Sequence, residues 1–489
     1  MPATMSAHTF FWHDYETFGA NPQYDRPAQF AGWRTDAQLN PMGEPVVWYC
    51  QPTPDVLPDP DSCLITGITP QHCRAHGIPE GRFAEAIATE LGRPGTIGVG
   101  YNSIRFDDEF TRHLLWRNLL DPYAREWRDG CGRWDLLDVV RMTWALRPQG
   151  MEWPLNGDGR PSFKLEHLSA ANGLLHEQAH DALSDVRATI ALAQRIRACQ
   201  PRLFDFAFSL HRKERVLQEL GLPVRAGAQR RFVHISGRFP VERGCLAVMW
   251  PLAMHPTNRN ELLAWDLAFD PRELAELRAE EVRYRLFTPQ ANLPPGVQRL
   301  PIKSVHLNRA PMVVGNVGVL EGTPTERFGI DWEAIERNTV HAHALPDLSA
   351  LWAAVFARDA PPAPRDVDAA LYDGFVGDED RRRLARLRML DPTDPAWRHA
   401  GFDDPRLPEL VFRYRARNHP HSLQASERAR WQAHCRARLI DGAGGGMPLT
   451  AYRQRLDALM TQAQSRHDHR AQTILAAVAD YVAELEVSV

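Results

Sequence analysis

Two acidic residues at the end of a predicted strand constrain this chain most. The apolar run Phe10-Phe11-Trp12 predicts a buried strand, and Asp14 and Glu16 follow closely. Side chains alternate along a strand, so these two carboxylates project from the same face, roughly 6–7 Å apart. Paired carboxylates at a strand end suit hard divalent cations such as Mg²⁺ or Mn²⁺. The alternative is a solvated acidic pair on an edge strand, because acids are mostly exposed.

Further acids stand at the ends of other predicted elements. Asp107 closes the run Asn102-Ser103-Ile104-Arg105-Phe106-Asp107, just after a short apolar run containing glycine. His180 and Asp185 stand at the start of an apolar helix. The order Asp-x-Glu, then Asn-x-x-x-Phe-Asp, then His-x-x-x-x-Asp resembles the DEDDh group of 3′→5′ exonucleases.

Longer segments narrow the resemblance to the bacterial exonuclease I family. They begin with His13-Asp14-Tyr15-Glu16-Thr17-Phe18-Gly19 and end with Tyr414-Arg415-Ala416-Arg417-Asn418, so they span most of the chain. The segments between them lie at 26–30, 64–70, 133–138 and 201–205. The resemblance implies a ribonuclease H-like exonuclease domain, followed by an SH3-like β-rich domain and a C-terminal helical domain.

We expect these three domains at residues 8–201, 202–355 and 361–489, with the linker Pro361-Pro362-Ala363-Pro364-Arg365 before the third. Strands mixed with helices in the first domain indicate an α/β fold. Apolar patterns predict its strands at 28–35, 44–50 and 96–101, and its helices at 83–91, 110–120, 134–146 and 181–196.

The resemblance implies a metal centre in which Asp14, Glu16, Asp107 and Asp185 hold two Mg²⁺ ions, for which Mn²⁺ could substitute. A phosphodiester is anionic, so a carboxylate cluster repels it unless cations intervene. One ion would lower the pKa of a bound water, and the other would stabilise the leaving 3′ oxygen. His180 is the candidate general base, because a neutral imidazole titrates near working pH. A lone histidine is otherwise more often a packing or capping residue.

Two neighbouring acids compete for these roles. Asp108 stands beside Asp107, and Asp181 stands beside the histidine that precedes Asp185. We prefer Asp107 and Asp185 because they match the family motifs.

The function implied is Mg²⁺-dependent 3′→5′ degradation of single-stranded DNA to 5′-mononucleotides, in DNA repair and recombination. An exoribonuclease is the alternative within the enzymes, because the sequence does not show how a 2′-hydroxyl would be treated. A single-strand-binding module that lost its chemistry is the alternative outside them. All five catalytic positions are filled, which argues against the second alternative.

Substrate contacts are expected where cationic and aromatic groups gather near the proposed site. Cations meet phosphates and rings stack on unpaired bases, although such residues are also ordinary core or solvated groups. The expected contacts are Glu16, Arg112, Tyr123, Trp127, Arg141 and Lys164. The family has an arginine where this chain has Lys164, and lysine cannot make a bidentate contact to phosphate.

Composition limits the partners and the compartment. The net charge of −4 excludes a generally basic surface, so DNA must meet a local basic groove. The seven cysteines show no Cys-x-x-Cys spacing, which fits a reducing cytoplasm better than a disulfide or zinc framework. The sequence shows no apolar run of membrane-spanning length and no signal-peptide pattern at its start. We expect a cytoplasmic monomer without membrane contact.

A protein partner is also expected. The resemblance implies binding of the acidic C-terminal tail of single-stranded DNA-binding protein, which ends in an aromatic residue and a free carboxylate. Arg147 matches a tail-contacting position of the family, while Phe206 stands where the family has tyrosine, so only ring packing remains there. The alternative for Arg147 is a solvated cation at a helix end, where positive charge is favourable anyway.

Arg147→Ala should weaken binding of the tail peptide because it removes a charge-assisted hydrogen bond to the terminal carboxylate. Hydrolysis of bare single strands should be unchanged. Fluorescence anisotropy with a labelled tail peptide measures the first effect, and equal affinity in the variant would remove Arg147 from the tail site.

Overall fold

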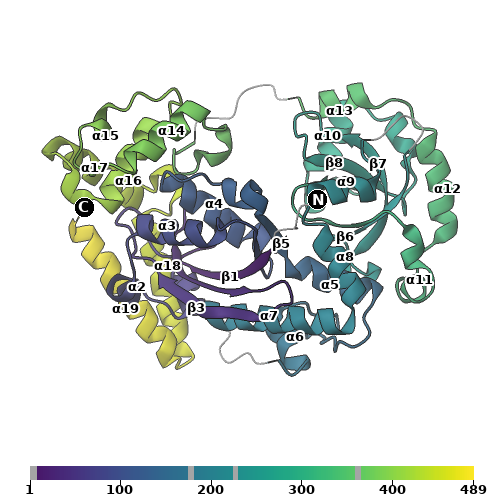
Figure 1. Cartoon of the computed structure of the whole chain (residues 1–489), viewed down its shortest axis with the longest axis horizontal. Coiled ribbons are helices and arrows are strands. Elements are labelled where there is room, and N and C mark those ends of the chain that lie inside the picture. The colour runs from purple at the N-terminus through teal and green to yellow at the C-terminus, as the bar shows by residue number, and fades with distance from the viewer. Residues whose placement is uncertain (1–7, 175–180, 224–228, 358–364, 489) are drawn as a thin grey trace, which may run out of the picture. The chain divides into compact units, whose positions relative to one another are not determined.

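The chain forms two compact units that are interleaved in sequence. The computed structural model describes residues 8–174, 181–223, 229–357 and 365–488. The first unit comprises residues 1–132, 176–190 and 363–489, and the second comprises 133–175 and 191–362. The elements of each unit are labelled in Figure 1.

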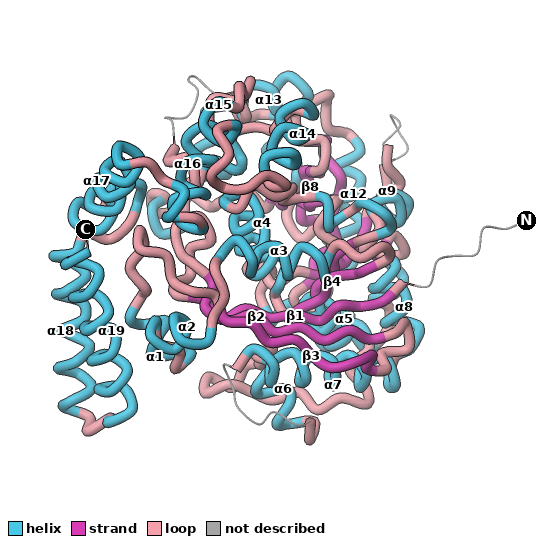
Figure 2. The backbone as a smooth tube through the Cα atoms, turned by 60° about the vertical axis from the view of Figure 1, so that its left-hand side comes forward, coloured by secondary structure: helices cyan, strands magenta, loops and turns pink. Residues whose placement is uncertain are grey.

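A five-stranded sheet in the order β3-β2-β1-β4-β5 forms the centre of the predicted exonuclease domain. Its strands are β1 (Thr9–Thr17), β2 (Pro27–Thr35), β3 (Pro41–Tyr49), β4 (Thr96–Gly100) and β5 (Gly132–Asp135). Strands β1, β2 and β3 pair antiparallel, whereas β1 and β4 run parallel. Figure 2 shows β4, β1, β2 and β3 side by side. The predicted α/β class is confirmed.

One face of β1 is apolar and anchors the sheet. Phe11 and Tyr15 pack in a core cluster with Phe30 of β2 and with Phe83 and Leu114 from two helices. The alternation of the strand places Asp14 and Glu16 on the opposite face. Gly32 of β2 is required here, because a Cβ at this position would lie 2.3 Å from the ring of Phe11. Burial of one face therefore fixes which side chains β1 presents on the other.

Four helices of the first unit connect the strands: α1 (Pro60–Thr66), α2 (Pro70–His76), α3 (Glu80–Leu91) and α4 (Asp107–Arg117). Helices α1 and α2 begin with proline after the N-cap residues Asp59 and Thr69. Helix α4 begins at Asp107 and not at residue 110, where its apolar residues predict. Its first turn is acidic, and acidic side chains are favourable at the positive end of a helix dipole. The helix predicted from residue 134 begins only at Leu136, because Asp135 ends β5 and caps that helix.

The C-terminal residues of the first unit are helical, as predicted, and they share core with the N-terminal part. The helices are α14 (Asp378–Leu387), α15 (Ala396–His399), α16 (Leu407–Asn418), α17 (Ala425–Asp441), α18 (Leu449–Ser465) and α19 (His469–Ser488). Helices α18 and α19 lie side by side, with α1 and α2 close by (Figure 2). Their buried cluster includes Phe18 and Ala28 together with Leu475 and Val478. The domain boundaries themselves stay a prediction.

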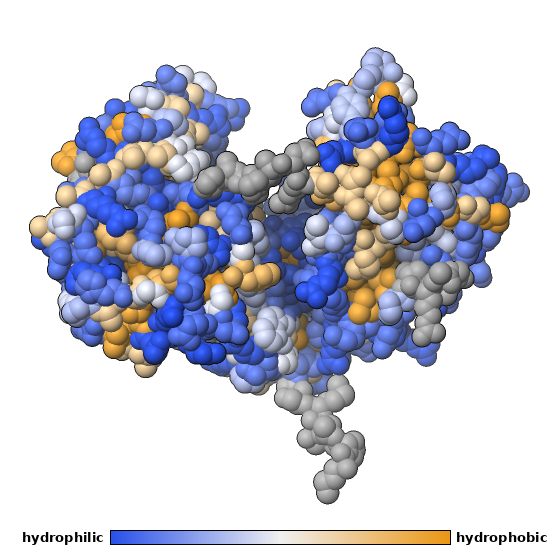
Figure 3. Space-filling model, turned by 90° about the horizontal axis from the view of Figure 1, so that it is seen from above, coloured by the Kyte–Doolittle hydropathy of each residue, from blue (hydrophilic) through white to orange (hydrophobic). Residues whose placement is uncertain are grey.

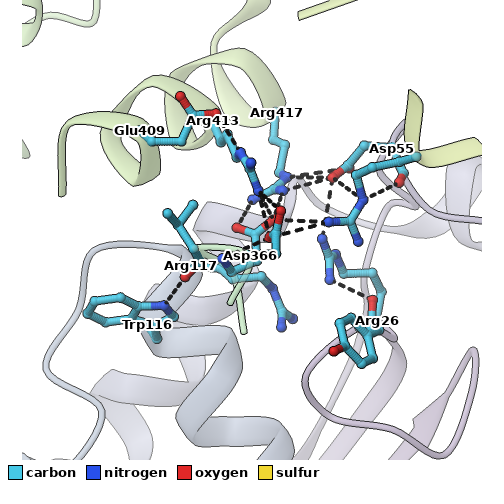
Figure 4. A network of polar contacts seen from close by, with 12 residues as sticks. Arg26, Asp55, Trp116, Arg117, Asp366, Glu409, Arg413 and Arg417 are labelled. Carbon is cyan, nitrogen blue, oxygen red and sulfur yellow. Dashed lines mark hydrogen bonds and ion pairs between the residues drawn. The ribbon is translucent and has the colours of Figure 1, made fainter. Parts of the chain in front are cut away.

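A buried network of ion pairs joins the same two parts of the first unit (Figure 4). Asp55 accepts hydrogen bonds from Arg417 of α16 at 2.7 Å, and both side chains are almost fully buried. Arg417 also pairs with Asp368, and Arg26 reaches Asp55 at 3.5 Å. Burial alone would raise the pKa of Asp55, but the charges of Arg417, Arg26 and Arg438 lower it well below its usual range.

The second unit contains the predicted β-rich domain. Its five-stranded sheet has the order β10-β6-β7-β8-β9 and only antiparallel neighbours. The strands are β6 (Phe232–Ile235), β7 (Leu246–Met254), β8 (Glu261–Asp266), β9 (Ile302–His306) and β10 (Met312–Val314).

Helices precede and follow this sheet in the chain. Those before it are α5 (Leu136–Leu146), α6 (Leu165–Ala171), α7 (Ala182–Cys199), α8 (Pro201–Ser209) and α9 (Lys213–Leu220). Those within and after it are α10 (Ala279–Phe287), α11 (Thr323–Phe328), α12 (Trp332–His343) and α13 (Ser349–Val355). The first half of α7, to Ile190, belongs to the first unit.

The surface mixes polar and apolar side chains. Figure 3 shows hydrophilic residues interspersed with apolar ones on the face that it draws. Within the described residues, every helix is too short or too polar to cross a membrane.

Arg417→Met should lower the free energy of unfolding by about 3–5 kcal/mol, because it leaves Asp55 and Asp368 buried without their main counter-charge. Arg455→Met is the matched control: its pair with Asp61 also joins the C-terminal helices to α1, but about half of the Arg455 side chain is exposed, so a much smaller loss is expected. Urea titrations measure both.

The same network predicts acid sensitivity. Because the pKa values of Asp55 and Asp368 are lowered on folding, their ionisation stabilises the fold above the unfolded-state pKa of about 4. This contribution is lost as the pH falls further. Two results would contradict this account. One is an equal loss of unfolding free energy in Arg417→Met and Arg455→Met. The other is a stability of Arg417→Met that falls on acidification, relative to its value at neutral pH, as much as that of the unmodified protein.

Candidate active site

Parallel pairing of β1 with β4 brings distant acids to one edge of the sheet. Trp12 stands opposite Val99, so the two strands end at the same edge. The chain then turns sharply: a Cβ at Gly100 would lie 2.8 Å from the carbonyl oxygen of His13, so only glycine fits this close approach. Helix α4 begins at Asp107, whose Oδ1 accepts a hydrogen bond from the backbone N–H of Tyr15 at 3.1 Å. This hydrogen bond places Asp107 beside Tyr15, the residue that stands between Asp14 and Glu16 on β1.

A third carboxylate comes from the first turn of α7. One oxygen each from Asp14, Glu16 and Asp185 lie within 4.8 Å of one another. Asp14 and Asp185 are partly exposed, whereas Glu16 is buried. Carboxylate oxygens gathered this closely are the donors that hard divalent cations prefer, so the residues present fit such an ion.

The electrostatics of the cluster support this interpretation. Burial, followed by the charges of Asp107, Glu16 and Asp185, raises the pKa of Asp14 well above its usual range. Burial, followed by the charges of Asp185 and Asp181, raises the pKa of Glu16 to about 8. Like charges are therefore close enough to disfavour one another, and a bound cation would relieve that repulsion. Asp107 acts on Asp14 more strongly than any other charge, so it lies close to Asp14, outside the set of three whose oxygens approach to within 4.8 Å.

The two rival acids have other partners. Asp108 is buried and accepts a hydrogen bond from Arg125 at 2.6 Å, which makes it one half of a buried ion pair. Asp181 caps α7 by accepting a hydrogen bond from the backbone N–H of Ser184 at 3.1 Å. These contacts make Asp108 and Asp181 the weaker candidates, and the ligand roles of Asp107 and Asp185 stay predictions. His180 lies outside the described residues.

Besides Glu16 of the carboxylate cluster, three expected substrate contacts lie in the first unit, in different settings. Arg112 is 5% exposed, and its guanidinium meets the carboxylate of Glu126 at 2.7 and 2.8 Å. Tyr123 borders a cavity of about 450 Å³ that is also lined by Trp116 and Phe375. Trp127 is 65% exposed, so its ring faces solvent. The geometry suits stacking at Trp127 best, while a phosphate at Arg112 would compete with Glu126.

The remaining expected substrate contacts, Arg141 and Lys164, lie in the second unit, as do Arg147 and Phe206 of the expected tail site. Arg141 donates a hydrogen bond to Asp138 at 2.6 Å, and Lys164 is exposed at the start of α6. Arg147 is exposed at the end of α5, where its Nη1 donates to the carbonyl of Leu146 at 2.6 Å. Phe206 of α8 lies beneath the guanidinium of Arg215, 5.7 Å from it. The roles of all these residues stay predictions.

Sequence reasoning gave no role to Gln29, although it lies in one of the segments that resemble the family. Gln29 is buried on β2 and contacts both Asp181 and the first residue of α7. The one sequence feature that could have indicated a role is a glutamine among the apolar residues of a predicted strand, since an amide buried there needs partners.

Three family models match most of the chain between residues 11 and 485. A model described as Exonuclease matches residues 11–193, one described as Exonuclease I SH3-like domain matches 211–358, and one described as Exonuclease I C-terminal domain matches 365–485. Among curated proteins, the exodeoxyribonuclease I of Escherichia coli is 44% identical over 88% of this chain and 89% of its own length. That of Haemophilus influenzae is 42% identical over 89% and 91%.

Solved structures agree with these matches. An exonuclease I from Methylocaldum szegediense, described as moderately thermophilic, superposes with a TM-score of 0.91 at 46% identity, over 98% of this chain and 99% of that one. Escherichia coli exonuclease I in complex with a dA16 oligonucleotide gives 0.90 at 40%, over 98% and 100%. A structure of SSB/exonuclease I in complex with the inhibitor CFAM gives 0.88 at 40%, over the same shares.

Asp14→Asn should leave the thermal stability in chelator unchanged or raise it. A carboxyl whose pKa is raised on folding is destabilising when ionised, at any pH above its unfolded value of about 4. The matched control is Asp108→Asn, which should lower the Tm because it leaves buried Arg125 with only the longer pair to Glu126, at 3.8 Å. Calorimetry at pH 7 distinguishes them, and a lower Tm for Asp14→Asn than for Asp108→Asn would contradict this electrostatic account.

Proposed function

The chain belongs to the exonuclease I family, and from this premise we propose that it removes 5′-mononucleotides from single-stranded DNA with two Mg²⁺ ions bound at its carboxylate cluster. The activity itself is that of a 3′→5′ exonuclease on single-stranded DNA. The observation that carries the metal proposal is the approach of Asp14, Glu16 and Asp185 to within 4.8 Å of one another. A role in DNA repair and recombination follows from the resemblance.

The carboxylates have separate tasks in this proposal. Asp14, Glu16 and Asp185 would hold the ions, and Asp107, fixed by the N–H of Tyr15, would complete the set. When bound, the ions would activate a water and neutralise charge on the leaving oxygen. His180 would take the proton of the attacking water as general base, which typically contributes about 10²–10⁴-fold. Glu16 would also face the terminal nucleotide.

Substrate binding would rely on the exposed cationic and aromatic residues. Trp127 offers a solvent-facing ring on which an unpaired base could stack. Lys164, also exposed, would meet a phosphate as a single point charge, without the fork of the family's arginine. Tyr123, Arg112 and Arg141 are the further contacts that the resemblance implies.

We also propose the partner and the compartment. Since a similar structure is of SSB/exonuclease I, the acidic tail of single-stranded DNA-binding protein would bind at Arg147. All seven cysteines are free thiols in the structure, which suits a reducing cytoplasm. We propose that the protein acts there as a monomer.

Labelled single-stranded DNA, duplex DNA and RNA, each with Mg²⁺ and with chelator, test this proposal together with Asp14→Ala. Single-stranded DNA should be shortened from its 3′ end only with Mg²⁺, and Asp14→Ala should remove most of this activity while keeping the fold, since Asp14 is not a core group. Near-normal digestion by the purified variant would rule out the two-metal assignment. Faster digestion of RNA would favour the exoribonuclease instead.

A further inference from the structure

Gln29 lies in a row of side chains that crosses the sheet on the face of the acidic cluster. Its backbone stands opposite Glu16 on β1 and opposite Tyr49 on β3. Residues paired across neighbouring strands project from the same face. Gln29 is 2% exposed, so its amide group is held away from water and must find partners within the protein.

Three contacts with described residues satisfy the amide of Gln29. Its Oε1 accepts a hydrogen bond from the backbone N–H of Ala182 at 3.3 Å. Its Nε2 donates to Asp181 Oδ1 at 3.3 Å and to the hydroxyl of Tyr49 at 3.1 Å. A backbone N–H only donates and a carboxylate only accepts, so the amide has a single orientation here.

Two of these contacts hold the first turn of α7. Asp181 in turn accepts from the N–H of Ser184, and its carbonyl accepts from the N–H of Asp185 at 3.0 Å. Among the three carboxylates that approach to within 4.8 Å of one another, Asp185 is the one that does not come from β1. Gln29 therefore links the strand beside Glu16 to the turn that carries Asp185.

We propose that Gln29 is a positioning residue for the nuclease centre: it locks the start of α7 against β2, so that Asp185 meets Asp14 and Glu16. The catalytic consequence of this inference rests on the proposed function. The contact that holds α7 against β2 does not depend on that function. Groups that orient metal ligands typically change metal affinity or activity by about 10–100-fold when they are removed.

Gln29→Met tests the inference, because methionine keeps the length and volume of the side chain but makes none of the three hydrogen bonds. Amide hydrogen exchange in the metal-free protein should rise in the peptide 181–190 and stay unchanged in α4. With Mg²⁺ and single-stranded DNA, kcat should fall about 10–100-fold, the Mg²⁺ concentration for half-maximal activity should rise, and KM for DNA should stay unchanged.

Two control variants separate positioning from a general loss of stability. Tyr49→Phe removes only the contact of Gln29 with β3 and leaves its contacts with α7, so exchange at 181–190 and kcat should be close to those of the unmodified protein. Thr35→Val removes a buried hydrogen bond from Trp12 at the other end of β2, 2.9 Å long, without touching α7. Thr35→Val should lower the Tm without a selective change in hydrogen exchange at 181–190.

The inference is overturned if Gln29→Met exchanges at 181–190 like the unmodified protein, or if Tyr49→Phe or Thr35→Val produces the same selective increase. Failure of the proposed function looks different. In that case the unmodified protein would not degrade DNA with Mg²⁺, while the exchange of Gln29→Met would still report whether Gln29 holds the turn.

Discussion

The structure depends on gathering like charges at one edge of a buried sheet. Packing of Phe11 and Tyr15 into the core commits the opposite face of β1 to Asp14 and Glu16. Parallel pairing with β4 then delivers Asp107, and α7 delivers Asp185. Burial, and after it the neighbouring carboxylates, raise the pKa values of Asp14 and Glu16, so ionising both acids here is costly. A divalent cation removes that cost, so the same repulsion that weakens the metal-free fold favours binding of the metal.

Such a centre requires a rigid surrounding structure, and the first unit supplies it with residues that are distant in sequence. The pair of Asp55 and Arg417 joins segments 362 positions apart, and the apolar cluster that holds Phe18 and Leu475 joins segments that are still farther apart. Breaking a buried pair costs far more than breaking an exposed one, because the remaining charge is left without a partner or water. The C-terminal helices thus act as structural support for the domain that carries the chemistry.

Local patterns made part of this structure predictable and left the rest open. Alternation along β1 was enough to place Asp14 and Glu16 on one face, since that geometry involves only neighbouring residues. The fold class and the helical C-terminal part also followed from periodicity and resemblance. Asp107 and Asp185 required the family motifs, because their approach to β1 depends on tertiary packing. The contact of Gln29 with Asp181 crosses 152 positions of the chain, and only the structure reveals it. The start of the helix predicted at residue 134 was wrong for a related reason: pairing of β5 in the sheet overrides the helical pattern of Trp134 and Asp135.

Crystals soaked with Mn²⁺ and a short single-stranded DNA would test the central claim most directly, through anomalous scattering at the manganese edge. The account predicts two peaks, about 3.5–4 Å apart, bordered by Asp14, Glu16, Asp107 and Asp185. Peaks at Asp108 or Asp181 in their place, or no peak at the cluster while DNA is bound there, would contradict it.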